Sequence, residues 1–262
     1  MTSPSSPIAF EIGPFPLRWY AIFILAGIFI GLSIVGRVAR RRGMDPNLVT
    51  EAAPWVLGSA ILGARAYFVA LEWRYFVDHP DEIVGLQLRG LTIHGALAGG
   101  ILAFAVICCR RREPFFRWAD TIAVGIPIGQ AIGRWGNWAN QEAFGDPSGL
   151  PWAVEIDPGR RPDRFAAEPT FHPTFLYESL LSLVIAAVLV VVVLRLGSRP
   201  WYRDGMGIGI YLILYGMARL PIERLRTDSL YIGPYPAAYW LSGALILAGA
   251  SLIAVRSKAS PS

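Results

Sequence analysis

The sequence has little charge. Only 16% of its 262 residues are charged, against about 25% in ordinary soluble domains. Hydrophobic residues make up 54% of the chain, and the mean hydropathy is +0.44. This composition excludes an ordinary soluble domain. It predicts an all-α integral membrane protein, because the apolar residues come in blocks long enough to cross a bilayer.

Cysteine and histidine are scarce as well, with two and three residues. Cys108 and Cys109 are neighbours in sequence, and neighbours on a helix do not face each other. They therefore predict apolar packing, with neither a disulfide nor a metal site. No spacing suits a metal, and we expect no cofactor. An internal repeat, which many transporters have, is also missing.

Seven apolar runs predict about seven transmembrane helices, since each has roughly the 20 residues that a spanning helix needs. They are residues 17–36, 52–71, 91–109, 119–139, 174–196, 205–222 and 237–255. The basic cluster follows the first run, so we expect that run to be a retained helix and no cleaved signal peptide. Residues 1–262 then form a single polytopic membrane domain. Residues 140–172 form a small external segment between helices four and five, with a short strand at 154–156.

The basic residues lie on one side of this predicted topology. The links after helices one, three and five, together with the tail, hold 13 of the 24 basic residues but only 5 of the 19 acidic ones. By the positive-inside rule this side is cytoplasmic, which places the N-terminus outside and the C-terminus in the cytoplasm. The isoelectric point near 9.5 thus reflects topology and anionic lipids, and we expect no nucleic-acid partner.

Glycines recur at intervals of four in three of the apolar runs. Small residues at this spacing let helices approach closely, so packing is the expected role. The glycines are Gly27 and Gly31, Gly95 and Gly99, and Gly125, Gly129 and Gly133.

Polar residues collect at the predicted outer ends of the helices. An ionisable residue within a membrane protein is a functional-site hypothesis by default. One external cavity could collect them from five or six helices. They are Tyr20, Arg65, His94, Arg134, Asn137, Asn140, Gln141, Glu142, His172, Tyr177, Glu178, Arg219, Glu223 and Arg226.

The spacing near residue 220 points to an anionic ligand. Arg219 and Glu223 are four apart and share a helix face. The guanidinium group of arginine is planar and can donate paired hydrogen bonds to a phosphate. Several arginines facing a membrane cavity therefore suggest a phospholipid headgroup as the ligand. Plainer roles stay open: Arg219 and Arg226 snorkelling at the interface, and His94 as a structural hydrogen-bond donor. Trp135 and Trp138 fit an interfacial aromatic belt.

Several motifs follow one another along the chain in a fixed order. They are Arg18-Trp19-Tyr20, Gly63-Ala64-Arg65, His94-Gly95, residues 133–145, His172-Pro173, Tyr177-Glu178 and residues 219–226. The longest, residues 133–145, is specific. The order of these motifs closely resembles the prolipoprotein diacylglyceryl transferases of bacteria, and the resemblance spans nearly the whole chain. Ala96 departs from the family, which often has a second glycine after the histidine.

The resemblance implies transfer of the diacylglyceryl group of phosphatidylglycerol to the lipobox cysteine of a prolipoprotein signal peptide. A thioether forms and glycerol 1-phosphate leaves, in the first step of lipoprotein maturation. The expected location is the bacterial inner membrane, with the active site toward the periplasm and membrane lipids as further partners. The implied catalytic residues are His94, Arg134 and Arg219. The implied substrate-binding residues are Tyr20, Arg65, Asn137, Asn140, Glu142, Gly145, His172, Tyr177, Glu178, Glu223 and Arg226.

Two other classes of protein remain open from the residues alone. A transporter or flippase for an anionic lipid would also need arginines around a cavity, but near the bilayer midplane and beside broken helices. Only Pro54 and Pro127 interrupt the predicted helices deeply. A lipid-binding structural protein would explain the arginines without the added His, Asn and Glu residues.

Overall fold

The computed structural model describes residues 1–4, 6–13, 15–84 and 90–258. The chain divides into two compact units. One consists of Met1–Gly43 and Ala119–Ser262, and the other of Met44–Trp118.

Seven long helices occupy the seven apolar runs. They are α1 (Trp19–Arg41), α2 (Asn47–Leu71), α4 (Ile93–Arg111), α5 (Phe115–Asn140), α6 (Thr174–Val191, extended by the π-turn η4, Val192–Leu196), α7 (Met206–Leu225) and α8 (Ala237–Ser257). In the described chain, all of these except α5 are long and apolar enough to span a membrane, which gives six candidate spans. α5 also contains Asp120, Gln130 and Arg134, so its place as a seventh span stays a prediction. Helices α2 and α5 continue through Pro54 and Pro127, which therefore do not break them.

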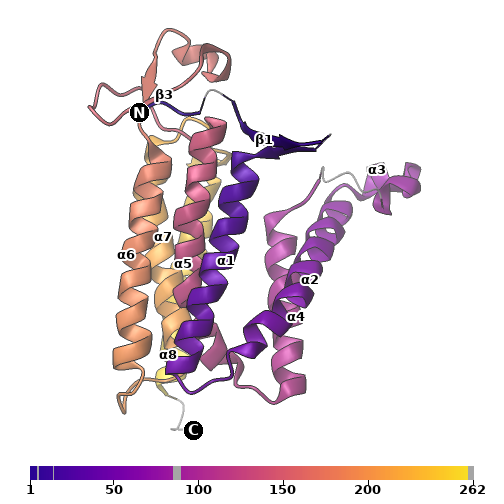
Figure 1. Ribbon diagram of the computed structural model, residues 1–262, viewed down its shortest axis with the longest axis vertical. Coiled ribbons are helices and arrows are strands. Elements are labelled where there is room, and N and C mark those ends of the chain that lie inside the picture. The colour runs from indigo at the N-terminus through magenta and orange to yellow at the C-terminus, as the bar shows by residue number, and fades with distance from the viewer. Residues whose placement is uncertain (5, 14, 85–89, 259–262) are drawn as a thin grey trace. The chain divides into compact units, whose positions relative to one another are not determined.

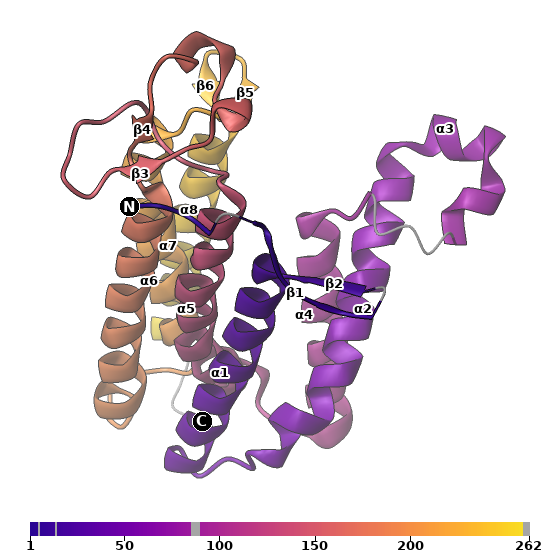
Figure 2. The same ribbon diagram turned by 45° about the horizontal axis from the view of Figure 1, so that its top comes forward.

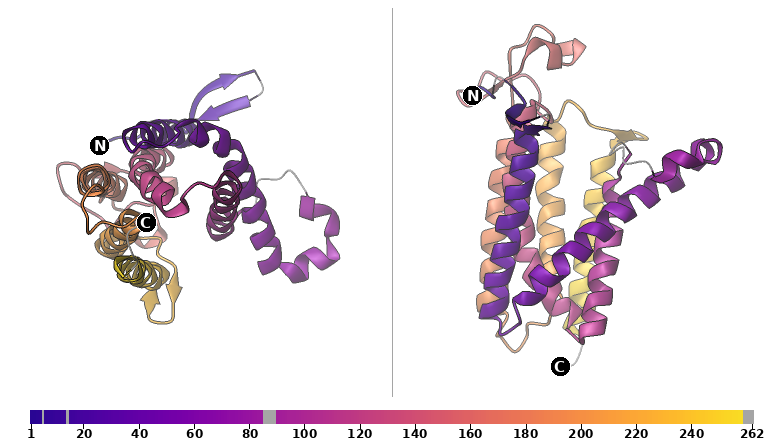
Figure 3. Two further views of the ribbon diagram at one scale, coloured as in Figure 1. Left: turned by 90° about the horizontal axis from the view of Figure 1, so that it is seen from below. Right: turned by 45° about the vertical axis from the view of Figure 1, so that its right-hand side comes forward.

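The larger unit is a bundle of α1, α5, α6, α7 and α8 (Figures 1 and 3). Its core joins α1, α5, α6 and α7 through Val38, Val124, Leu189 and Tyr211. The α1–α5 contact depends on glycine. A Cβ at Gly27 would lie 2.8 Å from the carbonyl oxygen of Gly129. The close helix approach predicted from the glycine spacing is thereby confirmed for this pair.

Short strands and turns lie at one end of this bundle (Figure 2). They are the antiparallel pairs β1 (Ile8–Ile12) with β2 (Phe15–Arg18), β3 (Val154–Glu155) with β4 (Thr170–Phe171), and β5 (Tyr231–Ile232) with β6 (Tyr235–Pro236). The β3–β4 segment also contains the 3-10 turns η2 (Pro158–Arg160) and η3 (Asp163–Phe165). The short strand expected at 154–156 is confirmed. Phe144, Phe171 and Phe175 form a separate aromatic core beneath it.

The opposite end of the bundle, where α8 ends (Figure 1), is held by Asp120. This fully buried carboxylate accepts hydrogen bonds from the backbone N–H groups of Gly205 (2.9 Å) and Ile208 (2.8 Å) and from the Tyr202 hydroxyl (2.7 Å). It thus satisfies two of the N–H groups at the start of α7, which have no carbonyl partner within the helix.

The smaller unit pairs α2 with α4 and also contains α3 (Trp73–Asp78) and η1 (Pro80–Val84). Gly63, Gly95 and Gly99 bring the two helix backbones together, which confirms the packing role expected for Gly95 and Gly99. The start of α4 is fixed to α2 because both the amide and the hydroxyl of Thr92 bond to the carbonyl of Ala64, at 3.3 and 3.1 Å.

Candidate functional site

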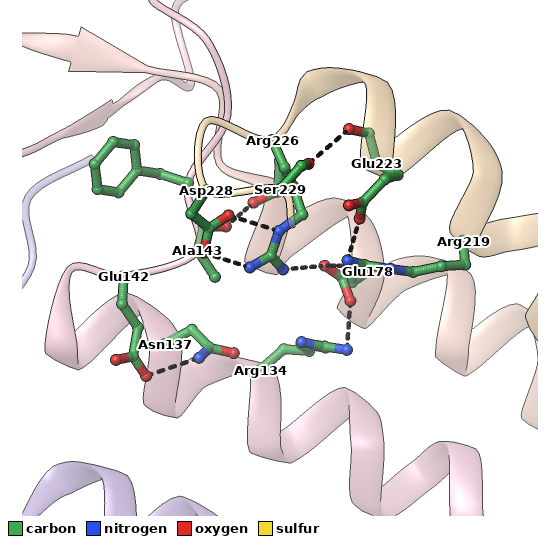
Figure 4. A network of polar contacts seen from close by, with 12 residues as sticks. Arg134, Asn137, Glu142, Ala143, Glu178, Arg219, Glu223, Arg226, Asp228 and Ser229 are labelled. Carbon is green, nitrogen blue, oxygen red and sulfur yellow. Dashed lines mark hydrogen bonds and ion pairs between the residues drawn. The ribbon is translucent and has the colours of Figure 1, made fainter. Parts of the chain in front are cut away.

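Glu178, in the second turn of α6, contacts arginine side chains from other parts of the bundle (Figure 4). Its Oε2 atom forms an ion pair with Nη2 of Arg134 at 2.5 Å, and its Oε1 atom accepts a hydrogen bond from Nη1 of Arg219 at 3.0 Å. Nη1 of Arg226 lies 3.6 Å from Oε1. The Glu178 side chain is only 8% exposed, so one buried carboxylate fixes the spacing of three guanidinium groups.

Two further carboxylates complete this cluster. Glu223 pairs with Nη2 of Arg219, as their spacing of four predicts, and its side chain is 3% exposed. Asp228 holds Arg226 through two bonds, Nε to Oδ1 at 2.9 Å and Nη2 to Oδ2 at 2.7 Å. We call Arg134, Glu178, Arg219, Glu223, Arg226 and Asp228 the arginine–carboxylate cluster.

Arg226 remains a cation in this setting. Burial lowers the pKa of its guanidinium, but the hydrogen bond and charge of Asp228 and the charges of the two glutamates raise it above its ordinary value. Planar guanidinium forks of fixed charge recognise phosphate through paired hydrogen bonds. The cluster therefore contains three guanidinium groups of the type that recognises phosphate, each paired with at least one carboxylate.

Gly145 places Arg226 in the cluster by a close approach of backbones. The two residues form an antiparallel bridge, and the next amide, of Asp146, donates to the carbonyl of Leu225 at 2.7 Å. A Cβ at position 145 would lie 2.8 Å from that Leu225 oxygen and 2.8 Å from Cβ of His172. The structure thus gives Gly145 a packing role at the end of α7.

The turn after α5 forms a second polar group. Glu142 accepts hydrogen bonds from Nδ2 of Asn137 (2.9 Å) and Nδ2 of Asn140 (3.4 Å), and its own amide donates to the Asn137 carbonyl. Gln141 and Ala143 on either side have positive φ, +52° and +57°, which is uncommon for residues other than glycine. The turn therefore holds Asn137 and Glu142 together near the Arg134 end of α5 (Figure 4).

The start of α6 carries a third group. Nδ1 of His172 lies 3.2 Å from the Tyr177 hydroxyl, which also accepts a hydrogen bond from Nε1 of Trp152 at 3.1 Å. Tyr20, near the start of α1, packs against α5 instead. A Cβ at Gly136 would lie 2.8 Å from its Cδ2 atom.

Two predicted site residues belong to the smaller unit. Arg65 bonds to backbone carbonyls, through Nε to Ile83 (3.1 Å) and through Nη2 to Glu82 (2.5 Å), and its guanidinium lies 5.1 Å from the Phe76 ring. These contacts tie α2 to η1. His94 is the second residue of α4.

Sequence reasoning missed two features of this end of the bundle. The sequence does not single out Asp228, although it lies only two residues after Arg226. The sequence gives Gln141 no role, whereas in the structure it holds the 140–172 segment by exchanging two hydrogen bonds with Asp157, at 2.8 and 2.7 Å. An acid close to a site arginine was the one available signal for Asp228.

The comparison with known proteins agrees with these motifs. The family model described as "Prolipoprotein diacylglyceryl transferase" matches residues 7–255. Relatives named phosphatidylglycerol–prolipoprotein diacylglyceryl transferase come from several bacteria. The protein of Trichormus variabilis is 41% identical over 264 residues, covering 99% of this chain and 93% of the relative.

Two further relatives give the same result. The protein of Synechococcus elongatus is 42% identical over 242 residues, covering 92% of this chain and 83% of the relative. The protein of Symbiobacterium thermophilum is 41% identical over 251 residues, covering 95% of this chain and 91% of the relative. The chain belongs to the prolipoprotein diacylglyceryl transferase family.

Proposed function

We propose that this chain transfers the diacylglyceryl group of phosphatidylglycerol to the cysteine thiol of a prolipoprotein, and that the arginine–carboxylate cluster binds the lipid phosphate. The names of the relatives supply the reaction and the two substrates. The observation that carries the assignment of the site is the convergence of Arg134, Arg219 and Arg226 on the single carboxylate of Glu178.

The reaction makes one bond and breaks one. The thiol sulfur attacks the glyceryl carbon that bears the phosphate ester, the carbon–oxygen bond breaks, and glycerol 1-phosphate leaves with the bonding electrons. Positive charge fixed near the departing oxygen lowers this barrier, because negative charge develops there in the transition state. Arg134 and Arg219 take that role in our proposal. Arg134, whose side chain is 24% exposed, is the more accessible of the two.

The thiol must lose its proton to become a nucleophile. His94 is the proposed base, because histidine is the side chain that most often acts as a general base. The nucleophile itself comes from the substrate peptide, so Cys108 and Cys109 have no part in the reaction.

The remaining polar residues are proposed to bind the substrates. Asn137 and Glu142, already bonded to each other, suit the hydroxyls of the glycerol headgroup. The other proposed contacts to lipid or peptide are Tyr20, Arg65, Asn140, Gly145, His172, Tyr177, Glu178, Glu223 and Arg226.

We also propose the orientation given by the charges. The basic Arg195, Arg199 and Arg203 lie in the link between α6 and α7, at the opposite end of the bundle from Glu178. By the positive-inside rule this puts the arginine–carboxylate cluster on the periplasmic side of a single membrane domain, with residues 140–172 external. The orientation can be tested in a variant lacking Cys108 and Cys109. A single cysteine is introduced at Ser148 or at Ser198, and its accessibility to a membrane-impermeant reagent is measured.

The function is tested with purified protein in detergent, phosphatidylglycerol and a synthetic signal peptide bearing one cysteine. The peptide should gain the mass of one diacylglyceryl unit, and a peptide with Cys→Ser should not. Arg134→Ala should abolish the gain while the protein still inserts, whereas Arg199→Ala, an exposed arginine outside the cluster, should leave it unchanged. Near-normal turnover by Arg134→Ala would remove the central role of the cluster.

A further inference from the structure

Asp228 occupies the edge of the Arg226 guanidinium that carries Nε and Nη2. Both carboxylate oxygens are bonded, to Nε and Nη2, at 2.9 and 2.7 Å. This is the paired geometry with which a guanidinium fork binds either a carboxylate or a phosphate. As long as Asp228 stays there, that edge of Arg226 is closed to a ligand (Figure 4).

The charges of the arginine–carboxylate cluster already balance. Its three guanidiniums face three carboxylates, all joined by ion pairs among the described residues. A phosphodiester would add one negative charge to a largely buried group, and uncompensated buried charge is costly. Binding is therefore easiest if one carboxylate leaves the cluster when the phosphate enters.

Asp228 is the carboxylate best able to leave. Its side chain is 50% exposed, against 8% for Glu178 and 3% for Glu223, which are held within helices. Leaving the cluster returns a carboxylate that is already half exposed to water, whereas Glu178 and Glu223 would first have to leave buried positions.

The backbone on both sides of Asp228 is anchored. The Thr227 hydroxyl donates to the carbonyl of Phe144 at 3.2 Å, and the Ser229 hydroxyl lies 3.5 Å from the carbonyl of Glu223. The side-chain contacts described for Asp228 go to Arg226. A rotation about the side-chain bonds of Asp228 is thus enough to open the fork.

We propose that Asp228 is a displaceable occupant of the Arg226 fork, which a ligand phosphate replaces on binding and which returns to expel the phosphate product. This inference rests on the proposed function, since it assigns the phosphate to the same cluster. The exchange conserves the charge of the cluster on entry. On exit, the returning carboxylate competes with the phosphate for Arg226. Asp228 would therefore weaken phosphate binding and hasten its release.

The test compares ligand affinity in wild-type protein and in Asp228→Asn, which keeps the shape and removes the charge. Binding of phosphatidylglycerol in detergent and of glycerol 1-phosphate is measured separately by calorimetry. We expect each affinity to rise about tenfold in the variant. A rise for one ligand alone supports exchange with that ligand's phosphate. Unchanged or weaker binding of both overturns the inference, and weaker binding would make Asp228 a positioning residue for Arg226.

Controls separate this result from a folding defect and from the proposed function. Asp204→Asn removes the charge of one partner of Arg42 in an arginine–aspartate pair outside the cluster, and should leave both affinities unchanged. Asp228→Ala serves as a second variant with the same expected direction. Because affinity is measured without turnover, failure of the transfer assay in wild-type protein overturns the function, whereas failure of the affinity change overturns only the exchange.

Discussion

Glu178 binds Arg134 and Arg219 through different oxygens of one carboxylate, at 2.5 and 3.0 Å. The three residues come from α5, α6 and α7, so this single group links the ends of three helices. A ligand phosphate that contacts both arginines therefore meets a spacing that the protein has fixed before binding. Such preorganisation reduces the reorganisation needed as charge develops.

Replacing Glu178 by Gln should destabilise the protein and nearly abolish transfer. Removing one partner of a buried ion pair costs about 3–5 kcal/mol, because the remaining charges lose their compensation. We expect a lower midpoint of thermal unfolding in detergent and a large loss of turnover. Glu168→Gln, an exposed acid in the 140–172 segment, should change neither. Wild-type turnover by the Glu178 variant would show that the arginine spacing does not matter.

Gly145→Ala should be destabilising, whereas Gly149→Ala, four residues later in the same segment, should be neutral. The new methyl group at 145 would lie 2.8 Å from the carbonyl oxygen of Leu225, but at 149 it meets nothing within 4 Å. Overpacking of this kind costs about 1–3 kcal/mol. In the Gly145 variant the midpoint of thermal unfolding and the affinity for phosphatidylglycerol should both fall, because the bridge to Arg226 is displaced. Equal behaviour of the two variants would contradict this packing role.

The sequence predicts features that depend on local spacing. The seven helices follow from run length, and the contact of Arg219 with Glu223 follows from the helical period. The convergence of arginines on Glu178 does not follow, because periodicity within a helix says nothing about the rotation and height of its neighbours. The pairing of Asp228 with Arg226 depends on the path of the chain after α7, which no period describes.

Glycine spacing gives a further case. It predicts close helix contact, and the α1–α5 and α2–α4 pairs confirm this, but it does not identify which helices pair. Partner choice depends on the whole set of facing side chains. For Arg65, the sequence suggested a ligand contact, while the described contacts to the carbonyls of residues 82 and 83 became visible only in the fold.

Gly63→Ala and Gly58→Ala, both in α2, should have opposite effects on stability. A Cβ at Gly63 would be forced into the carbonyl of Gly95 and would separate α2 from α4, whereas at Gly58 it meets nothing within 4 Å. Alanine is favoured over glycine in a helix by about 1 kcal/mol, so the Gly58 variant should unfold at an equal or higher temperature. The Gly63 variant should unfold at a lower one. A fall of the same size at both positions would indicate a backbone effect without close packing.

Asp120→Ala should destabilise α7 from the end opposite the arginine–carboxylate cluster. The carboxylate accepts the N–H groups of Gly205 and Ile208 as well as the Tyr202 hydroxyl, and all of these would lose their acceptor in a buried setting. Loss of a helix cap costs about 0.5–2 kcal/mol, and each unsatisfied buried group adds about 1–3 kcal/mol. The midpoint of thermal unfolding should fall clearly.

Tyr202→Phe is the matched control for this change. It removes one of the three hydrogen bonds of Asp120 but leaves both backbone bonds at the start of α7 in place. Its effect on the unfolding midpoint should therefore be much smaller than that of Asp120→Ala. Arg219 lies toward the far end of the same helix. If Tyr202→Phe keeps its affinity for phosphatidylglycerol and Asp120→Ala loses affinity, the loss of affinity is due to the loosened start of α7. An equal loss of stability in both variants would instead assign the role of Asp120 to its bond with Tyr202.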